Sequence, residues 1–304
     1  MFLHFREKKH KFDMDHFLSF RLRKVFKKKM GYELNLREPK TFSEKIQWLK
    51  IHYRNSRLTS CADKIAVRDY IEERIGDKYL IPLYHTFSRV DDIVVSELPE
   101  KFVLKPNNSS GKVIVCSDKD KLDWNKIHGE LADWLSDNYF YVNGEWQYKN
   151  IIPKIVCERL LEGDIVDFGF FCFDGTPFIC NAVQKNELES NKGVCRKMNW
   201  NRIRGYSECF YDLDFNQLEL RQNALIKEVP KPINWSKMIE LARILSTGFP
   251  FVRVDFRECN GNIYFGELTF TPANGMEPFH PASWDLRLGK KIHLEKIPDK
   301  YIKV

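Results

Sequence analysis

An Asn-Gly dipeptide between two apolar-rich runs is the feature that most constrains the fold of this chain. The runs cover 251–256 and 263–269, and Asn260-Gly261 lies between them. Such a pattern predicts an antiparallel β-hairpin with a tight turn. Because side chains alternate between the two faces of a strand, the hairpin also determines which polar residues lie together.

Four polar side chains are expected on one face of this hairpin. Arg253 and Asp255 lie on the first strand, and Glu267 and Thr269 lie on the second. The apolar residues of the other face point into a core: Val252, Val254, Leu268 and Phe270. Grouping a guanidinium and two carboxylates on an apolar hairpin is costly unless they bind a ligand. Carboxylates suit Mg²⁺ and arginine suits phosphate, so one interpretation is a site for magnesium with nucleotide phosphates. The other is a surface hairpin with an internal salt bridge.

Length and composition indicate a globular protein. The chain has 304 residues, of which 43% are hydrophobic and 14% aromatic, enough for one large domain or two modest ones. No apolar run approaches the roughly 20 residues of a transmembrane helix, and no signal-peptide pattern opens the chain. The eight cysteines form no CxxC pair, and several lie in apolar runs. We expect free, buried thiols in a reducing cytosol and no zinc site.

Positive charge is concentrated at the start of the chain. Residues 1–29 contain ten Lys or Arg and three Asp or Glu, and their net charge of +7 equals that of the whole protein. We expect 1–34 to form a basic amphipathic helical segment. Its phenylalanines could contact an anionic membrane surface, or they could pack against the body of the protein. Nucleic-acid binding is not expected, because no second basic patch and no recognised binding motif occur.

The spacing of apolar residues and turn signals predicts mixed helices and strands. Thr41 and Glu44 have the spacing of a capping box, and Gly31 is suited to end a helix. Helices are expected at 13–29, from 42 onward, and at 63–75, 123–138 and 235–246; strands are expected at 101–105, 113–116, 155–161, 166–173 and 177–184. Residues 185–234 are expected to form a long polar excursion. Without a regular βαβ alternation, the fold class is α+β, or mixed α/β.

Three further segments are compatible with a nucleotide site. Lys105 precedes a small-residue loop that includes Ser109, Ser110 and Gly111, where backbone N–H groups can approach phosphate, although such loops are also ordinary hairpin turns. The spacing is not that of a Walker A loop. Lys64 and Arg68 would share one face of the 63–75 helix. Glu158-Arg159-Leu160 ends an apolar strand and could present backbone groups to an adenine edge.

Taken in order, these segments resemble the ATP-grasp superfamily. Its members have an early helical lysine, a lysine before a small-residue flap, a Glu-led hinge, and a final strand pair with Arg, Asp, Glu and usually Asn. The segment RVDFRECNGNIYFGELTFTPANGM is similar to the equivalent part of D-alanine–D-alanine ligases. Within the superfamily the chain resembles the TupA-like ATP-grasp family, named for teichuronopeptide biosynthesis. The similar blocks lie at 42–50, 61–70, 101–111, 145–151 and 170–175, and from Gly248 onward.

The resemblance implies an ATP-grasp fold of two α+β subdomains that clamp ATP, over 35–304. The flap would lie around 101–116 and the metal-binding subdomain at about 155–290. ATP would bind at Lys64, Lys105, Ser109–Gly111 and Glu158–Leu160, Mg²⁺ would bind at Asp255, Glu267 and Thr269, and Arg253 would be catalytic. The implied reaction is amide formation through an acyl phosphate.

The chain departs from the family pattern at two positions. Thr269 occupies the position where the superfamily commonly has Asn. Gly169 stands where related sequences often have a lysine before the FFCF run, and Lys185, Lys192 or Lys197 could replace that lysine.

The resemblance implies an amine or amino acid and a carboxylate as substrates, the latter plausibly a uronic acid of a capsular or O-antigen polysaccharide. The expected location is cytoplasmic, with peripheral contact at the inner face of the membrane. Two alternatives stay open. A nucleotide-sugar glycosyltransferase would need a metal-binding DxD motif, and that spacing occurs at Asp13, Asp118 and Asp212. A non-catalytic nucleotide-binding scaffold would bind ATP without turnover.

Overall fold

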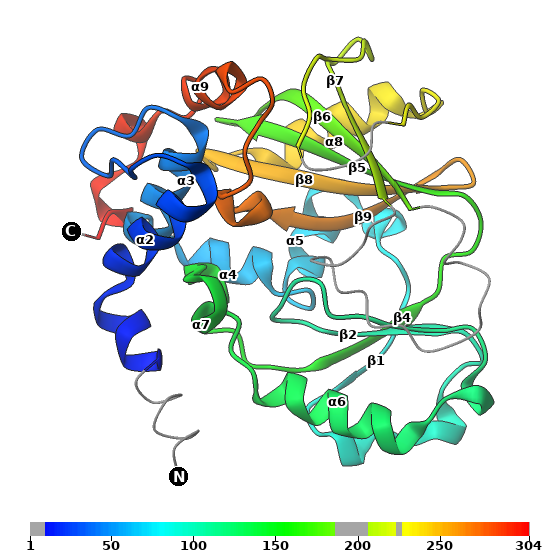
Figure 1. The fold of residues 1–304 in the computed structure, drawn as a ribbon. Coiled ribbons are helices and arrows are strands. Elements are labelled where there is room, and N and C mark those ends of the chain that lie inside the picture. The colour runs from blue at the N-terminus through cyan, green and yellow to red at the C-terminus, as the bar shows by residue number, and fades with distance from the viewer. Residues whose placement is uncertain (1–9, 186–205, 223–226, 304) are drawn as a thin grey trace.

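The chain forms two antiparallel sheets that face each other across its middle. The structure, a computed structural model, describes residues 10–185, 206–222 and 227–303 (Figure 1). In Figure 1 the larger sheet lies above, the smaller sheet lies below, and helices α4 and α5 lie between them on one side. These helices are α4 Ser56–Ala62 and α5 Val67–Ile75. The α+β class expected from the sequence is therefore confirmed.

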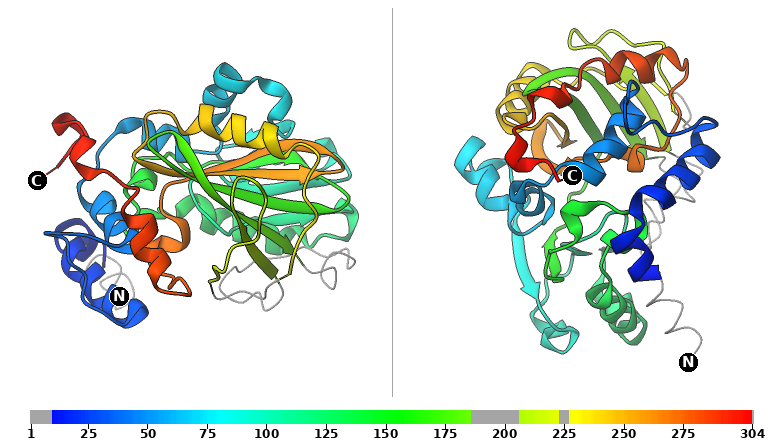
Figure 2. Two further views of the ribbon diagram at one scale, coloured as in Figure 1. Left: turned by 90° about the horizontal axis from the view of Figure 1, so that it is seen from above. Right: turned by 90° about the vertical axis from the view of Figure 1, so that its left-hand side faces the viewer.

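The large sheet has five strands in the order β7-β6-β5-β8-β9. Their bounds are β5 Ile165–Phe173, β6 Thr176–Lys185, β7 Tyr206–Tyr211, β8 Phe251–Cys259 and β9 Asn262–Thr269. Helix α8, Trp235–Ser246, covers one face of this sheet, as the view from above shows (Figure 2). Buried aromatic and aliphatic residues fill the space between them, including Phe168, Phe170 and Trp235. The opposite face carries the polar side chains of Arg253 and Asp255, and at one end Phe171 and Phe251, which pack on Phe42.

The small sheet has four strands in the order β1-β4-β2-β3. Their bounds are β1 Leu83–Phe87, β2 Phe102–Pro106, β3 Ile114–Cys116 and β4 Ile155–Arg159. Its outer face packs on α6, Trp124–Ser136, and forms a separate buried cluster around Phe102, Leu104 and Leu131. The small sheet therefore has its own core and turns its other face toward the large sheet.

The remaining helices lie at one end of both sheets. They are α2 Leu18–Met30, α3 Phe42–His52, α7 Phe140–Asn143 and α9 Ser283–Gly289. The capping box expected at the start of α3 is present, since Thr41 accepts from the Glu44 N–H and Glu44 accepts from the Thr41 N–H. Short 3₁₀ helices complete the chain: η1 Asp77–Tyr79, η2 Val90–Asp92, η3 Val95–Glu97, η4 Lys119–Lys121, η5 Trp146–Tyr148, η7 Pro272–Gly275, η8 Leu294–Lys296 and η9 Asp299–Tyr301.

Several elements differ from those predicted. The helix expected over 63–75 is interrupted, because Asp63 accepts a hydrogen bond from the Ile65 N–H at 2.8 Å and the chain turns before α5 begins. Strand β7 lies within the polar excursion, and β1 and α9 were not expected. The N-terminal helix is broken at Phe17 into 10–16 and α2, and Gly31 ends it in the left-handed conformation, with φ of 80°.

Within the described ranges, no helix has both the length and the apolar composition needed to cross a membrane.

Candidate active site

The C-terminal hairpin brings its four polar side chains together on the inner face of the large sheet. Asp255 pairs with Glu267 and Arg253 pairs with Thr269 in the β8–β9 register. The Arg253 guanidinium contacts Asp255 through two hydrogen bonds, from Nε to Oδ1 at 2.6 Å and from Nη2 to Oδ2 at 2.7 Å. Such a two-point contact sets the orientation of both groups. The hairpin thus presents the Arg253 guanidinium and two carboxylates on this face, which also carries Arg257, whose Nε donates to Asp167 Oδ1 at 2.7 Å.

The Thr269 hydroxyl lies between the two carboxylates. Its Oγ1 is 2.7 Å from Asp255 Oδ2 and 2.7 Å from Glu267 Oε1. A hydroxyl has a single proton, so it can donate to only one of these oxygens at a time. Arg253 acts on both carboxylates with its positive charge, and Lys64 acts on Glu267. Hard oxygen donors are the ligands that Mg²⁺ prefers, so this donor set fits a magnesium ion.

The two carboxylates have different acidities. Burial raises the pKa of Asp255 to about 6, although Arg253 opposes the shift. Burial also acts on Glu267, but Lys64, the Thr269 hydroxyl, Arg253 and Lys105 together hold the pKa of Glu267 below its usual value. Glu267 therefore carries its charge at neutral pH, and Asp255 titrates within a pH unit or two of neutrality.

A lysine–glutamate pair on the small sheet faces this hairpin. Lys105 on β2 and Glu158 on β4 form an ion pair between Lys105 Nζ and Glu158 Oε1. Val103 pairs with Glu158 and Lys105 pairs with Val156, so the two charged residues are diagonal neighbours on the inner face. Because Lys105 lowers the pKa of Glu267, its charge reaches the hairpin carboxylate. The two sheets thus contribute charges to one site.

Lys64 lies in the turn between α4 and α5 and not in a helix, which corrects the prediction for this residue. Its backbone N–H donates to Asn107 O at 3.1 Å, and its Nζ donates to the carbonyl of Ser109. Burial lowers the pKa of Lys64. Arg68 does not share a helical face with it, since Arg68 belongs to α5 and donates to Ile81 O at 3.0 Å. The turn still directs Lys64 toward the site.

The loop after β2 contains buried side-chain atoms that have no hydrogen-bond partner within the described chain. Asn107 is anchored, with Nδ2 donating to Asp63 Oδ1 at 3.0 Å. Ser109 Oγ and Asn108 Oδ1 are buried and have no hydrogen-bond partner in the described chain. Ser110 is exposed, and Gly111 has φ of 77°, a conformation that favours glycine. A phosphate oxygen could accept from such a hydroxyl and from loop N–H groups.

The expected hinge residues take different positions. Glu158 is buried and points toward the site, whereas the neighbouring Arg159 donates from Nη2 to the Tyr264 hydroxyl at 3.0 Å. That contact joins the end of β4 to β9. Leu160 follows β4 and is partly buried. The hinge segment therefore connects the two sheets at this end of the site.

Gly169 is needed because three groups already fill the space above it. A Cβ atom at this position would lie 2.3 Å from Asn181 Oδ1, 2.7 Å from Asp255 Oδ1 and 2.9 Å from Arg253 Cδ. A lysine here would displace the Arg253–Asp255 pair. Of the proposed replacements, Lys185 ends β6, and Lys192 and Lys197 lie outside the described residues.

Several polar residues of the site were missed from the sequence, among them the Arg257–Asp167 pair. Asn181 on β6 is buried and donates to Glu208 Oε1 on β7 at 2.8 Å. Burial raises the pKa of Glu208, and the charge of Arg253 partly offsets the shift. The available signal was a single Asn in the apolar run FICNAV. Glu208 could not have been found, because the strand that carries it was not predicted.

A second polar cluster lies beside the hairpin. Glu145 is buried and contacts the Thr271 hydroxyl, to which Gln147 Nε2 also donates at 3.0 Å. Burial raises the pKa of Glu145 and lowers the pKa of Lys50 to about 8. The contacts of Glu145 and Gln147 hold the segment that follows β9 against residues 145–147.

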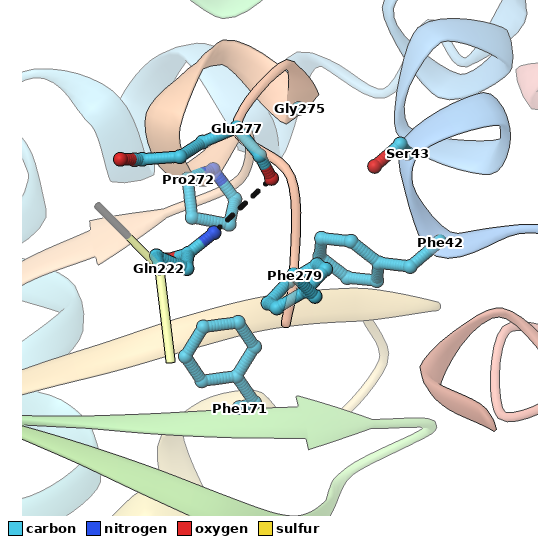
Figure 3. Close-up of a pocket in the computed structure, with 8 residues that line it drawn as sticks. All are labelled: Phe42, Ser43, Phe171, Gln222, Pro272, Gly275, Glu277 and Phe279. Carbon is cyan, nitrogen blue, oxygen red and sulfur yellow. Dashed lines mark hydrogen bonds between the residues drawn. The ribbon is translucent and has the colours of Figure 1, made fainter. Parts of the chain in front are cut away.

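Two hollows border this region. A cavity of about 10 Å³, with space for one water, lies at the end of the large sheet, where Phe42, Phe171 and Phe279 gather (Figure 3). A larger hollow of about 470 Å³ opens between α5 and β1. Its lining residues are Ile65, Arg68, Asp69, Glu72, Asp77, Leu80, Pro82 and Leu83. The small cavity is too small for a nucleotide, and neither hollow is lined by Arg253, Asp255, Glu267 or Thr269.

In each of the three DxD motifs, one aspartate is engaged in an ion pair or a hydrogen bond within the protein. Asp15 pairs with Lys149 at 2.6 Å, Asp118 pairs with Lys121 at 2.6 Å, and Asp212 accepts from the Asn216 N–H at 2.8 Å. Asp118 and Asp120 lie near Glu100 in a largely exposed acidic group. None of these residues adjoins the hairpin site, so they give no support to a glycosyltransferase.

No curated protein matches the chain. Among solved structures, D-alanine–D-alanine ligase from Bacillus anthracis is 16% identical, with 82% of this chain and 74% of that chain covered and a TM-score of 0.44. L-amino acid ligase from Bacillus licheniformis is 12% identical, with 69% and 40% covered and a TM-score of 0.40. Phosphoribosylamine–glycine ligase from Thermotoga maritima is 11% identical, with 71% and 49% covered and a TM-score of 0.42.

The family model described as TupA-like ATPgrasp matches residues 44–293, which include every residue of the site. The chain therefore belongs to the TupA-like ATPgrasp family.

Proposed function

We propose that the protein joins a carboxylate to an amine in a reaction that consumes ATP and requires Mg²⁺. The observation that carries the proposal is the joint placement of Arg253, Asp255 and Glu267 opposite Lys105. Acidic groups suited to a metal lie near basic groups suited to phosphate, since Lys64 and Lys105 help to hold the pKa of Glu267 below its usual value. Such an arrangement suits phosphoryl transfer, which depends mainly on positioning and on electrostatic stabilisation.

The reaction would proceed in two steps. A carboxylate oxygen attacks the γ-phosphorus of ATP, the bond to the β–γ bridging oxygen breaks, and ADP leaves with an acyl phosphate formed. The amine nitrogen then attacks the acyl carbon, phosphate leaves, and the nitrogen loses a proton to give the amide. Arg253 would stabilise charge on the transferring group and on the oxyanion.

The roles of the other site residues follow from the family resemblance. Lys105 and Lys64 would bind phosphate oxygens, together with the loop at Ser109, Ser110 and Gly111. Asp255, Glu267 and Thr269 would hold Mg²⁺, which when bound neutralises the charge on the phosphate oxygens. The segment Glu158–Leu160 would contact the adenine edge.

The finer substrate assignment is a uronic acid of a capsular or O-antigen polysaccharide, coupled to an amino acid or small amine. It is supported by the family resemblance and not by a contact in the site. We also propose a cytoplasmic location, because the seven described cysteines are free and buried, as expected in a reducing compartment. The domain assignment that we propose is a basic segment at 1–34 and an ATP-grasp domain at 35–304.

Phosphate release from ATP provides the test. Uronic acids and amino acids should be offered singly and in combination, with product mass measured in parallel. We expect release to require both substrates and the product mass to equal their sum minus water. ATP binding without release under any combination would favour a non-catalytic scaffold and refute the ligase.

A further inference from the structure

The helical segment 10–30 uses one face to pack on the protein. Met14, Leu22 and Phe26 are buried, with exposed fractions of 4%, 5% and 0%. Leu22 and Phe26 belong to a cluster with Leu34 and Met276. In α2, residues four apart share a face, so this packing leaves the opposite face directed outward.

The outward face exposes phenylalanines. Phe12, Phe17 and Phe20 are 54%, 52% and 57% exposed, and Val25 is 42% exposed. The rings of Phe12 and Phe17 are 6.1 Å apart, so they are contiguous. Single exposed apolar residues are common, but several close together usually mark an interaction site. The segment therefore combines packing on the body with an apolar strip that the body does not cover.

Positive charges surround this apolar strip. Residues 10–30 contain seven Lys or Arg and two Asp, a net charge of +5. Lys24 and Lys28 are exposed, and Lys24 Nζ lies 4.4 Å from the centre of the Phe20 ring. Both acidic residues are already paired, Asp15 with Lys149 at 2.6 Å and Asp13 with Arg21 at 3.8 Å. The outward face is consequently basic and aromatic.

We propose that this face binds an anionic lipid bilayer at the level of the headgroups. Phenylalanines that enter the interface and lysines that contact acidic headgroups are the two features of interfacial helices. A second copy of the same face would bring basic residues against basic residues, which disfavours self-association through it. This inference is independent of the ligase reaction, because none of its residues belongs to the active site.

Co-sedimentation with vesicles tests the proposal, using full-length protein and vesicles of phosphatidylcholine with or without 30% phosphatidylglycerol. Phe17→Ser with Phe20→Ser should weaken binding to the anionic vesicles by at least about tenfold. Lys24→Gln with Lys28→Gln should weaken it by about 25-fold, from about five-fold per charge. Binding of the unaltered protein should also fall when salt is raised from 0.1 M to 0.5 M.

Matched controls change the same chemistry elsewhere. Ile233→Ser removes an apolar residue that is 91% exposed, and Lys126→Gln with Lys303→Gln removes two exposed charges. Both controls should bind vesicles as the unaltered protein does, and circular dichroism should be unchanged for all variants. The proposal is overturned if the unaltered protein does not bind anionic vesicles at low salt, if the phenylalanine variant binds equally well, or if the face captures only nucleic acid.

Discussion

The two sheets hold their charged residues in different ways. On the large sheet Arg253 contacts Asp255 at two points, and Thr269 and Glu267 complete a closed set of contacts. On the small sheet Lys105 contacts Glu158 at one point. A guanidinium fork is directional and an ammonium group is a point charge. The large sheet thus provides a preorganised platform, and the small sheet provides a cation that can exchange its partner for phosphate.

The two sheets also differ in the size of the buried cluster that supports each of them. The large sheet is covered by α8 and belongs to the largest buried cluster, whereas the small sheet rests on a separate cluster with α6. Metal ligands tolerate little displacement, and phosphate contacts tolerate more. We therefore expect changes on the large sheet to affect turnover more than changes on the small sheet.

The largest effect is expected from Glu267→Gln. The substitution keeps the shape of the side chain and removes the charge that is held ionised at neutral pH, so it should reduce ATP turnover by about 100-fold or more. Phosphate release measures the effect, and circular dichroism checks the fold. Glu240→Gln, on the exposed side of α8, is the control and should retain turnover. Normal turnover by Glu267→Gln would contradict the assignment of Glu267 as a Mg²⁺ ligand on the large sheet.

Lys105→Ala should mainly weaken ATP binding. The loss of one charge-assisted hydrogen bond corresponds to about 1.5–3 kcal/mol, measured by calorimetric titration with ATP. Lys101→Ala is a matched control, because Lys101 immediately precedes β2. Lys101 also forms an ion pair, with Glu162 at 2.6 Å, but both side chains of that pair are exposed. Lys105→Met with Glu158→Gln removes both charges of the buried pair and should recover stability but not ATP affinity. Unchanged affinity in Lys105→Ala would show that the small sheet does not bind phosphate.

Gly169→Ala should destabilise the platform by about 1–3 kcal/mol, because the added methyl group overlaps Asn181 and Asp255. Urea denaturation measures the change. Gly129→Ala is the control: Gly129 lies in α6 with nothing within 4 Å of its Cβ position, and the change should stabilise by about 0.5–1 kcal/mol. Equal responses of the two variants would contradict the close contacts above Gly169.

The raised pKa of Asp255 predicts how Mg²⁺ binding depends on pH. The folded value of about 6 lies above that of a free aspartate, so in metal-free protein this group stabilises the fold below about pH 4 and loses that contribution as the pH rises through about 6. A metal ligand must be deprotonated. The gain in melting temperature on adding Mg²⁺ should therefore be larger at pH 7 than at pH 5, with about tenfold weaker binding at pH 5. Asp255→Asn should remove this difference, and an equal gain at both pH values in the unaltered protein would show that Asp255 does not bind the metal.

Local sequence signals determined much of the fold and half of the site. The Asn-Gly turn and strand alternation predicted that Arg253 and Asp255 share a face, because both signals act over a few residues. The capping box at Thr41 and the helix at 235–246 were predicted for the same reason. The order of the motifs indicated the family, which the family model confirms.

Tertiary structure decided the remainder. The interruption at Lys64 depends on Asp63, whose carboxylate also accepts from the distant Asn107. Strand β7 forms by pairing with β6 across a long polar excursion, so its residues carry little local signal. The same pairing brings Glu208 to Asn181. The pKa of Asp255 and the exclusion of any side chain at Gly169 arise from burial among neighbours that are distant in sequence. The alternation of apolar and polar residues along a strand shows which face of the sheet a side chain occupies. It does not show which strand pairs beside it, so these neighbours are set only when the strands assemble into one sheet.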